Sequence, residues 1–481
     1  MDTQVRGPVR VRFAPSPTGY LHVGGARTAI YNELLRRSLG GSLILRIEDT
    51  DLERSNEAMV QQIISALTWL GIEWDEGPFL QSARVEQHRA AARRLMAEGK
   101  AYACFRTQEE LAAKREELHA RGESYRYRTA FERCPPEEAE RRIAAGEPYA
   151  IRLRMPDHEI VVDDLVRGRV VFPEESQDDL IILRSDGNPI YHLSVVVDDI
   201  DMGITHVIRG EDHLSNTPKH IGLFTALGAS LPAFAHLPLI LGPDGKKLSK
   251  RNGAAAVEDF REQGFLPQTL YNYLALLGWS PGDDRELMSR DELAAAFTVE
   301  RLGRTASTFD PEKLRWMNVH YLPNLPLGEV MRHVQPFLDQ KGYGGDSEWV
   351  SRVVDMHRIR AKTLPELIEQ IGHFFAAEVA YPAEESAHFL EQGAVPELID
   401  ELATRYEGLD DFSIATTDTA LRALAKEKGV KAGQLIHPTR FALSASAAGP
   451  PLFDLVAALG REKSVARLRA FAAQLRSAGV A

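Results

Sequence analysis

The feature that most constrains the fold is a strand–helix–strand pattern near the N-terminus. Residues 9–13 (Val-Arg-Val-Arg-Phe) alternate strictly between apolar and charged side chains, which predicts a strand. Residues 43–47 (Leu-Ile-Leu-Arg-Ile) form a nearly continuous apolar run, typical of a strand buried in a parallel sheet. Between them, apolar residues at helical spacing predict a helix that begins near Gly24-Gly25 and runs toward Arg37. This βαβ order predicts a Rossmann-type sheet.

The same alternation returns in a later part of the chain. Residues 205–209 predict a strand, residues 216–228 a helix that opens with Asn-Thr-Pro, and residues 236–241 the last strand. The two halves predict one sheet interrupted by an inserted α+β module. Within that insertion we predict helices around 107–121 and 135–145 and strands around 150–155, 161–171 and 180–184.

From about residue 255 strand patterns are absent and Ala- and Leu-rich helical segments dominate. We therefore predict an α/β Rossmann-type catalytic domain with an α+β insertion, followed by an all-α C-terminal half. The predicted domains are two catalytic halves at 1–100 and 191–255, the insertion at 101–190, and helical domains at 256–322 and 323–481.

Composition narrows the class of protein. The chain has 481 residues, too many for a single hydrophobic core. No apolar run approaches the roughly 20 residues that span a bilayer, and the N-terminus lacks the apolar core of a secretion signal. Cys104 and Cys134 cannot form a disulfide framework or complete a zinc site alone. We expect a cytoplasmic protein with no membrane partner.

The acidic net charge does not decide whether the protein binds nucleic acid. The formal net charge is −12, but affinity for nucleic acid depends on where Lys and Arg are placed rather than on the total.

Charged residues follow several of the predicted strands. Arg12 lies near the end of the first strand, Glu48 follows the second, and Arg209 closes the third. The last strand leads into a cationic loop at 242–251. Because ligands bind beyond the carboxyl ends of parallel strands, one pocket is predicted to hold a carboxylate, an ammonium group and a polyphosphate.

Each signal alone has an ordinary explanation. His22 before the first helix is most simply a capping or surface histidine, and a run of lysines is usually solvated surface. A P-loop is excluded because Gly25-Ala26 stand where Lys-Ser/Thr should follow the glycines, and no G-x-G-x-x-G follows the first strand. The joint placement of the signals is what points to a site.

Residues 15–25 read Pro-Ser-Pro-Thr-Gly-Tyr-Leu-His-Val-Gly-Gly, and residues 247–251 read Lys-Leu-Ser-Lys-Arg. These stretches resemble the two paired signatures of the class I aminoacyl-tRNA synthetases, in their glutamyl form. Further similar stretches lie, in the same order, at 46–51, 191–194, 197–199, 207–213 and 309–318.

The resemblance implies activation of L-glutamate by ATP with Mg²⁺ and transfer to the 3′-terminal adenosine of tRNA(Glu). It implies glutamate contacts from six residues: Arg12, Ala14, Ser16, Glu48, Tyr191 and Arg209. It implies ATP contacts from His22, Gly24, Gly25, Asp212, Ile240, Lys247, Ser249 and Lys250. Of these, the catalytic residues would be His22, Lys247 and Lys250.

The resemblance also implies which group each charged residue binds. Arg12 and Tyr191 would hold the side-chain carboxylate, Glu48 the α-ammonium, and Arg209 the α-carboxylate. An arginine fork suits a carboxylate and a glutamate suits an ammonium, so the chemistry agrees.

The sequence departs from the family pattern in three places. Gly25 replaces a second signature histidine, and Val195 stands where some members carry an asparagine. Some bacterial members bind zinc in the insertion, but of that pattern only Cys104 is present, with Arg106 and Phe131 at the next positions. We therefore predict that no zinc is bound.

The resemblance implies that the insertion holds the acceptor end of tRNA, that residues 256–322 contact the stem, and that the last domain binds the anticodon. Arg358 and Arg360 are candidate anticodon readers, although a solvated helix face explains them equally well. A monomer is expected. Three alternatives stay open: a glutaminyl-tRNA synthetase, which has C-terminal β-barrels; a truncated paralogue that glutamylates a modified base; and an inactive tRNA- or nucleotide-binding relative.

Overall fold

The computed structural model describes residues 8–50, 56–248, 255–390 and 394–478. The chain forms two compact units. The first comprises residues 1–262 and 267–311, and the second comprises residues 263–266 and 312–481.

The first unit is built on a seven-stranded sheet with the order β3-β2-β1-β9-β10-β6-β7. All neighbours pair in parallel except β6 and β7, which are antiparallel. Since β1 lies between β2 and β9, the strand order reverses there, which opens a crevice at the carboxyl ends of the strands. The strands are β1 (Val9–Phe13), β2 (Gly41–Ile47), β3 (Glu76–Leu80), β6 (Ile160–Asp164), β7 (Gly168–Phe172), β9 (His206–Gly210) and β10 (Ala233–Leu237).

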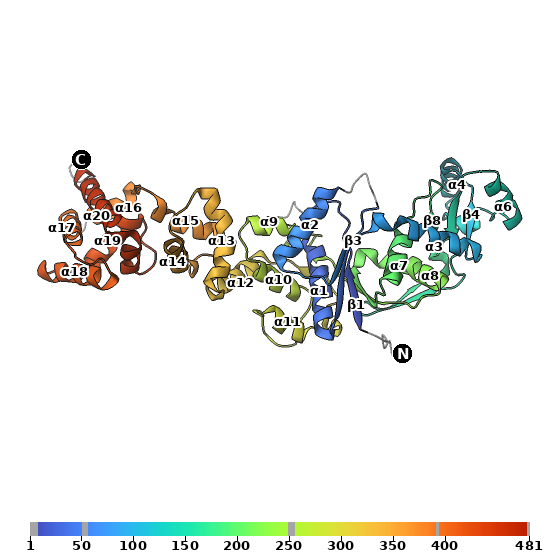
Figure 1. Cartoon of the computed structure of the whole chain (residues 1–481), viewed down its shortest axis with the longest axis horizontal. Coiled ribbons are helices and arrows are strands. Elements are labelled where there is room, and N and C mark those ends of the chain that lie inside the picture. Colours follow the sequence, from blue (N-terminus) through green and yellow to red (C-terminus); the bar gives the residue numbers. More distant parts are fainter. Residues whose placement is uncertain (1–7, 51–55, 249–254, 391–393, 479–481) are drawn as a thin grey trace. The chain divides into compact units, whose positions relative to one another are not determined.

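Helices cover both faces of this sheet, with α1 (Val23–Leu39) and α2 (Glu57–Leu70) on one face and α7 (Tyr191–Asp201) and α8 (Thr217–Leu227) on the other (Figure 1). The helices α1 and α2 end at glycines in the left-handed conformation, Gly40 with φ 66° and Gly71 with φ 68°. A side chain is strained in that conformation, so glycine is the natural stop. The predicted βαβ unit is confirmed.

The region predicted as an insertion is divided between two sheets. Strands β4 (Ala101–Cys104), β5 (Ala150–Leu153) and β8 (Ile181–Leu183) form a separate antiparallel sheet. The single strand predicted at 161–171 is wrong, because β6 and β7 form a hairpin there. That hairpin extends the main sheet through the pairing of Asp164 with Phe234. The helices of this region are α4 (Gln108–Ala120), α5 (Tyr127–Ala130) and α6 (Pro136–Ala144).

The last strand predicted at 236–241 is also wrong in extent. Strand β10 ends at Leu237, and Pro238 follows, which has no N–H to donate to a sheet. The chain then forms β11 (Ile240–Leu241), which pairs with β12 (Ser307–Thr308) in a second small sheet. A short strand thus exists beyond residue 255, where none was expected.

Four further helices complete the first unit. Helix α3 (Val85–Ala97) packs with α7 over the three-stranded sheet, and α10 (Pro267–Leu276) and α11 (Arg290–Ala296) pack on α1. Helix α9 (Val257–Glu262) follows the cationic loop. Sequence periodicity missed α3, β3 and α7.

The second unit contains only helices within its described residues, in agreement with the predicted all-α half. They are α12 (Pro311–Asn324), α13 (Leu327–Lys341), α14 (Ser347–Arg358), α15 (Leu364–Phe375), α16 (Ala383–Leu390), α17 (Val395–Glu407), α18 (Ile414–Glu427), α19 (Gly433–Ser444) and α20 (Leu452–Ala478). Among all described residues, no helix has the length and apolar character needed to cross a bilayer.

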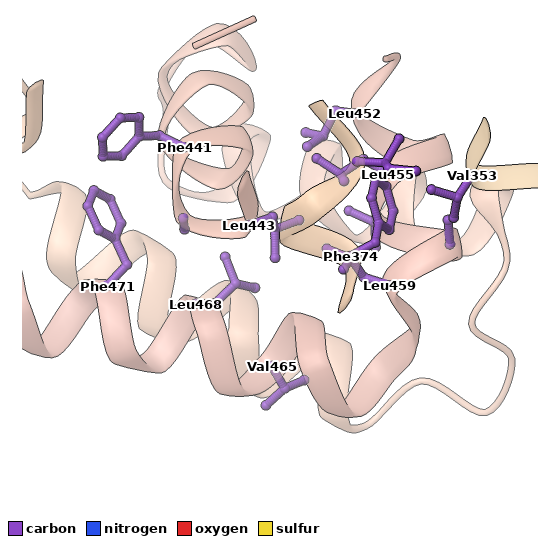
Figure 2. Close-up of a cluster of buried hydrophobic side chains, with 14 of the residues drawn as sticks. Val353, Phe374, Phe441, Leu443, Leu452, Leu455, Leu459, Val465, Leu468 and Phe471 are labelled. Atoms are coloured by element: carbon purple, nitrogen blue, oxygen red, sulfur yellow. The ribbon is translucent and has the colours of Figure 1, made fainter. Parts of the chain in front are cut away.

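Helix α20 organises the core of the second unit. It is bent at Gly460, which has φ 78°. In Figure 2, Leu455 and Leu459 lie near Phe374, before the bend, and Phe471 lies near Phe441, after it. Figure 2 shows Phe471 of α20 beside Phe441 of α19, with ring centroids 5.5 Å apart. Leu468 lies in the same cluster and is fully buried.

We expect Leu468→Ala to lower the free energy of unfolding of the second unit by about 2–5 kcal/mol, because the buried side chain leaves a cavity. The control is Ile414→Ala, since Ile414 is 48% exposed and should change stability by no more than about 0.5 kcal/mol. Urea unfolding followed by circular dichroism measures both. Equal effects of the two substitutions would contradict the assignment of this core.

Candidate active site

A cavity of about 430 Å³ opens at the carboxyl ends of β1, β2 and β9. Every predicted glutamate or ATP residue that the structure describes lines it: Arg12, Ala14, Ser16, His22, Gly24, Gly25, Glu48, Tyr191, Arg209, Asp212, Ile240 and Lys247. The two other predicted residues, Ser249 and Lys250, lie outside the described residues. The structure thus brings together in one cavity segments that are about 200 residues apart in the sequence.

Backbone hydrogen bonds join these segments around the cavity. The Glu48 N–H donates to the carbonyl of Pro15 at 3.0 Å, which ties the end of β2 to the turn after β1. The Val23 N–H donates to the carbonyl of Ala255 at 2.9 Å. Since Lys247 lines the cavity and Ala255 bonds to the residue after His22, both described flanks of the cationic loop lie at this site.

His22 serves as the N-cap of α1 and also lines the cavity. Its Nδ1 accepts from the N–H of Gly24 at 3.1 Å, so any ring proton is on Nε2. Burial lowers the pKa of His22, and the charge of Lys247 lowers it further, against a backbone hydrogen bond at Leu248 that raises it. His22 is therefore a neutral donor at neutral pH, beside the positive end of the α1 dipole.

A buried ionic cluster forms the inner wall. Asp199 on α7 accepts from Arg46 at 2.8 Å and from Arg12 at 3.4 Å through the same oxygen. Arg46 also lies 3.5 Å from the carboxylate of Glu48. Arg46, which the sequence did not single out as a site residue, is fully buried, and its charge is balanced by both carboxylates. The cluster fixes the position of Arg12 and Glu48.

Asp198, adjacent to Asp199, anchors α7 from the other side. Its carboxylate accepts from Arg84 at 2.7 Å, from His88 at 2.8 Å and from Gln81 at 2.9 Å. Burial alone would raise the pKa of Asp198, but these donors hold it below its ordinary value. These bonds anchor the C-terminal half of α7, the helix whose first residue, Tyr191, lines the cavity.

The pKa shifts of the groups that line the cavity follow from their burial. Burial raises the pKa of Glu48, and the charges of Arg46 and Arg12 oppose this only in part. Burial also raises the pKa of Tyr191, whose hydroxyl lies 3.2 Å from Nδ1 of His213. Burial lowers the pKa of Arg209 to about 10, so Arg209 stays positively charged at neutral pH.

Two charged or titratable residues that line the cavity, Arg27 and His213, were not predicted from the sequence. Arg27 of α1 is buried and donates to the carbonyls of Leu277, at 3.2 Å, and Pro238, which fixes the connection after β10. His213 lies beside Tyr191. An arginine on an apolar helix face and a lone histidine after a strand carry no sequence signal for a ligand site.

Known proteins resemble the chain over nearly its whole length. Residues 8–316 match the family model of the catalytic domain of class I tRNA synthetases (E and Q), and residues 329–472 match an anticodon binding domain. A glutamate–tRNA ligase of Desulforudis audaxviator is 46% identical, with 97% of this chain and 96% of the relative covered. A glutamate–tRNA ligase of Moorella thermoacetica is 45% identical over 96% of this chain and 97% of the relative.

A solved structure agrees with these relatives. The crystal structure of a glutamate tRNA ligase from Elizabethkingia meningosepticum, in complex with its amino acid, superimposes with a TM-score of 0.85 at 32% identity. The match covers 98% of this chain and 100% of that one. The chain belongs to the glutamate–tRNA ligase family of class I tRNA synthetases.

The comparisons and the fold exclude two of the three alternatives. The relatives are covered over their full length, including the helical anticodon-binding region, so a truncated paralogue is excluded. The described residues of the second unit form only helices, which does not fit the β-barrels of a glutaminyl enzyme. Class I synthetases in general use ATP with Mg²⁺.

The two candidate anticodon readers of this synthetase differ in their surroundings. Arg358 forms an ion pair with Asp355 at 2.7 Å and donates to the carbonyls of Leu322, at 3.4 Å, and Leu325, at 2.5 Å. Its guanidinium is thus engaged with the protein itself. Arg360 is exposed, two residues further on. Of the two, the geometry favours Arg360 for an RNA contact.

The region where some relatives of this synthetase bind zinc is filled by protein contacts. The guanidinium of Arg106 lies over the ring of Phe131, 5.0 Å from its centroid. The Cys104 sulfur lies 3.2 Å from the hydroxyl of Tyr127. Within the described parts of the chain no His, Cys, Asp or Glu cluster is arranged for a metal ion. The absence of zinc stays a prediction.

The raised pKa of Glu48 leads to a pH dependence. Binding an ammonium group requires the ionised carboxylate, so kcat/KM for glutamate should fall as the pH decreases through a pKa above the ordinary 4.5 of a glutamate. The profile of kcat/KM against pH, at saturating ATP and tRNA, measures this.

Glu48→Gln should remove this step from the profile and lower kcat/KM for glutamate by roughly tenfold to a hundredfold, the value of one charged hydrogen bond. The control is Glu57→Gln, because Glu57 is exposed at the start of α2. A Glu48→Gln enzyme that keeps the wild-type acid step would show that another group titrates.

Proposed function

We propose that the chain activates L-glutamate with the magnesium complex of ATP and transfers it to the 3′-terminal adenosine of tRNA(Glu). The observation that supports this most directly is the single cavity lined by Arg12, Glu48 and Arg209. Two guanidinium groups and one carboxylate match an amino acid that carries two carboxylates and one ammonium group.

The side-chain carboxylate of glutamate is assigned to Arg12 and Tyr191, the ammonium to Glu48 and the α-carboxylate to Arg209. Arg12 is only 4% exposed and shares the carboxylate of Asp199 with Arg46, so glutamine, with a neutral amide, would leave the charge of a desolvated arginine only partly compensated. The smaller contacts come from Ala14 and Ser16 in the turn after β1.

ATP is assigned to the other end of the cavity. Its phosphates lie at the start of α1, against His22, Gly24 and Gly25, where the helix dipole favours anions. Its nucleoside contacts Asp212 and Ile240. The cationic loop supplies Lys247, Ser249 and Lys250 to the pyrophosphate leaving group.

Two displacements complete the reaction. An oxygen of the α-carboxylate forms a bond to the α-phosphorus of ATP, and the bond to the bridging oxygen breaks, which releases pyrophosphate. The 2′-hydroxyl of the terminal ribose then attacks the acyl carbon, and AMP leaves. No side chain forms a covalent bond, so the protein contributes positioning and stabilisation of the charge that develops on the phosphates, by His22, Lys247 and Lys250.

The tRNA is assigned along the length of the chain. The acceptor end is held by residues 101–190, the stem by residues 256–322 and the anticodon by residues 323–481. We propose a cytoplasmic monomer that binds no zinc, with glutamate, ATP and tRNA(Glu) as its partners.

Pyrophosphate exchange with ATP, in the presence of glutamate and tRNA(Glu), tests the function. We expect exchange with glutamate and little with glutamine. Arg12→Ala should lower kcat/KM for glutamate about a hundredfold or more, since an arginine–carboxylate pair in a dry site is lost. Arg10→Ala is the matched control, because Arg10 pairs with Glu76 and does not line the cavity.

The results of the exchange assay distinguish an active ligase from an inactive relative. No exchange under any tRNA condition would establish an inactive relative that only binds tRNA or nucleotide. Exchange with glutamine as good as with glutamate would contradict the role of Arg12. Charging assays with purified tRNA(Glu) and tRNA(Gln) then define which tRNA is used.

For the anticodon, we expect Arg360→Ala to raise KM for tRNA(Glu) about tenfold to a hundredfold without lowering the melting temperature, as for the loss of one base contact. Arg358→Ala should instead lower the melting temperature, because its contacts are with Asp355 and the carbonyls near α12. If Arg358→Ala instead raised KM for tRNA(Glu) and Arg360→Ala lowered the melting temperature, Arg358 would be the anticodon reader.

A further inference from the structure

Arg209 is held by neutral hydrogen-bond acceptors of the described part of the chain. It is only 6% exposed, and its guanidinium donates to Nε2 of His236 at 3.0 Å and to Nδ1 of His220 at 3.3 Å. Its remaining bonds go to the hydroxyl of Thr217 at 3.0 Å and the carbonyl of His213 at 3.3 Å. Among the residues that the structure describes, no carboxylate forms an ion pair with Arg209, whereas Asp199 is shared by Arg12 and Arg46.

The direction of each hydrogen bond fixes the protonation of the histidines. A guanidinium donates only, so Nε2 of His236 and Nδ1 of His220 must each carry a lone pair. Both imidazoles are therefore neutral, with the proton on the opposite nitrogen. For His236 that nitrogen lies 2.6 Å from the carboxylate of Asp164, and for His220 it lies 3.1 Å from Nδ1 of His192.

Asp164 is itself fixed at the end of β6. One of its oxygens accepts from the backbone N–H groups of Val166 at 2.9 Å, Arg167 at 2.8 Å and His236 at 3.2 Å. The other oxygen is left for the ring of His236. The carboxylate therefore selects the His236 tautomer that accepts from Arg209.

The neutrality of both histidines agrees with their surroundings. Burial lowers the pKa of His220, and the charge of Arg209 lowers it further. Burial also lowers the pKa of His236, although the carboxylate of Asp164 opposes this. Neither ring competes with Arg209 for an anion.

We propose that Asp164 and His236 are positioning residues that orient Arg209 through a neutral acceptor. The full positive charge of Arg209 then faces the α-carboxylate of the amino acid. This inference rests on the proposed role of Arg209. A carboxylate bonded directly to Arg209 would compete with the substrate for the guanidinium. An imidazole orients the same group and adds no charge, and the one carboxylate of this relay is separated from Arg209 by the imidazole ring.

Asp164→Asn tests the relay with the least change in shape. The amide oxygen keeps the three backbone bonds, but the amide N–H₂ donates to His236 and selects the opposite tautomer, as the equivalent change does in catalytic triads. The Nε2–H of His236 then faces the N–H of Arg209. We expect KM for glutamate to rise about tenfold to a hundredfold while KM for ATP stays within about twofold.

The tautomer itself is measured by nitrogen NMR of histidine-labelled full-length protein, with the signal of His236 assigned by its loss in His236→Gln. We expect a protonated Nδ1 and a bare Nε2 in the wild type and the reverse in Asp164→Asn. This readout requires neither substrate nor activity. Asp163→Asn is the matched control, since Asp163 is the exposed neighbour on the same strand.

His236→Gln gives a second, independent variant. The side-chain amide oxygen can accept from Arg209 without help from Asp164, so we expect a smaller rise in KM for glutamate. Adding Asp164→Asn to His236→Gln should then change KM by less than about twofold, a non-additivity expected of residues that act in one chain. Additive losses, with equal effects on ATP and glutamate, would reduce Asp164 to a structural role and overturn the inference.

The remaining outcomes distinguish the relay from the function on which it rests. A wild-type His236 protonated on Nε2 overturns the relay, whatever Arg209 binds. A tautomer that reverses in Asp164→Asn with no change in KM for glutamate also overturns it. Arg209→Lys then decides the proposed function separately: a large rise in KM for glutamate keeps Arg209 as the α-carboxylate ligand, and no rise removes it.

Discussion

The removal of arginine side chains from water at one edge of a parallel sheet is the constraint on which the first unit depends. Arg46 is fully buried, and Arg12 and Arg209 are nearly so. Such charges are costly unless they are paired and hydrogen-bonded. The protein compensates them unequally: Asp199 bonds to Arg46 and Arg12, while the acceptors of Arg209 among the described residues are neutral. The site therefore keeps positive charge that a substrate anion can neutralise.

Sheet topology allows this compensation. Because β1 lies between β2 and β9, the residues that end these strands converge although they are distant in the sequence. Helix α7 then brings Asp198 and Asp199 to the same place from the covering layer, and Asp198 is secured by Arg84 and His88. These paired charges thus border the cavity in fixed positions, as preorganised electrostatic stabilisation requires.

The sequence predicted what depends on short-range patterns. The βαβ unit could be located because the alternation at 9–13, the helical spacing of apolar residues in α1 and the apolar run of β2 are local signals. The lining of the cavity could be predicted because carboxyl ends of parallel strands meet, and the resemblance added residues such as Ala14 and Ile240, which have no chemical signal of their own. The pairing of β6 with β10 could not be predicted, because Asp164 and Phe234 are joined only in the folded sheet. The hydrogen bonds from Arg209 to His236 and His220 could not be predicted either. They depend on the side-chain conformations of residues on β9, β10 and α8, which periodicity does not encode.

The position of Asp164 changes how the region between the two catalytic halves should be understood. Judged by sequence, residues 101–190 are an insertion added to a complete sheet, but β6 and β7 extend that sheet, and Asp164 at the end of β6 lies one imidazole ring away from Arg209. A displacement of the β6–β7 hairpin would move the carboxylate that selects the His236 tautomer. With Arg209 as the proposed ligand of the α-carboxylate, the hairpin belongs to the amino-acid site, and a domain boundary that assigns it wholly to tRNA binding would separate residues that act on one guanidinium group.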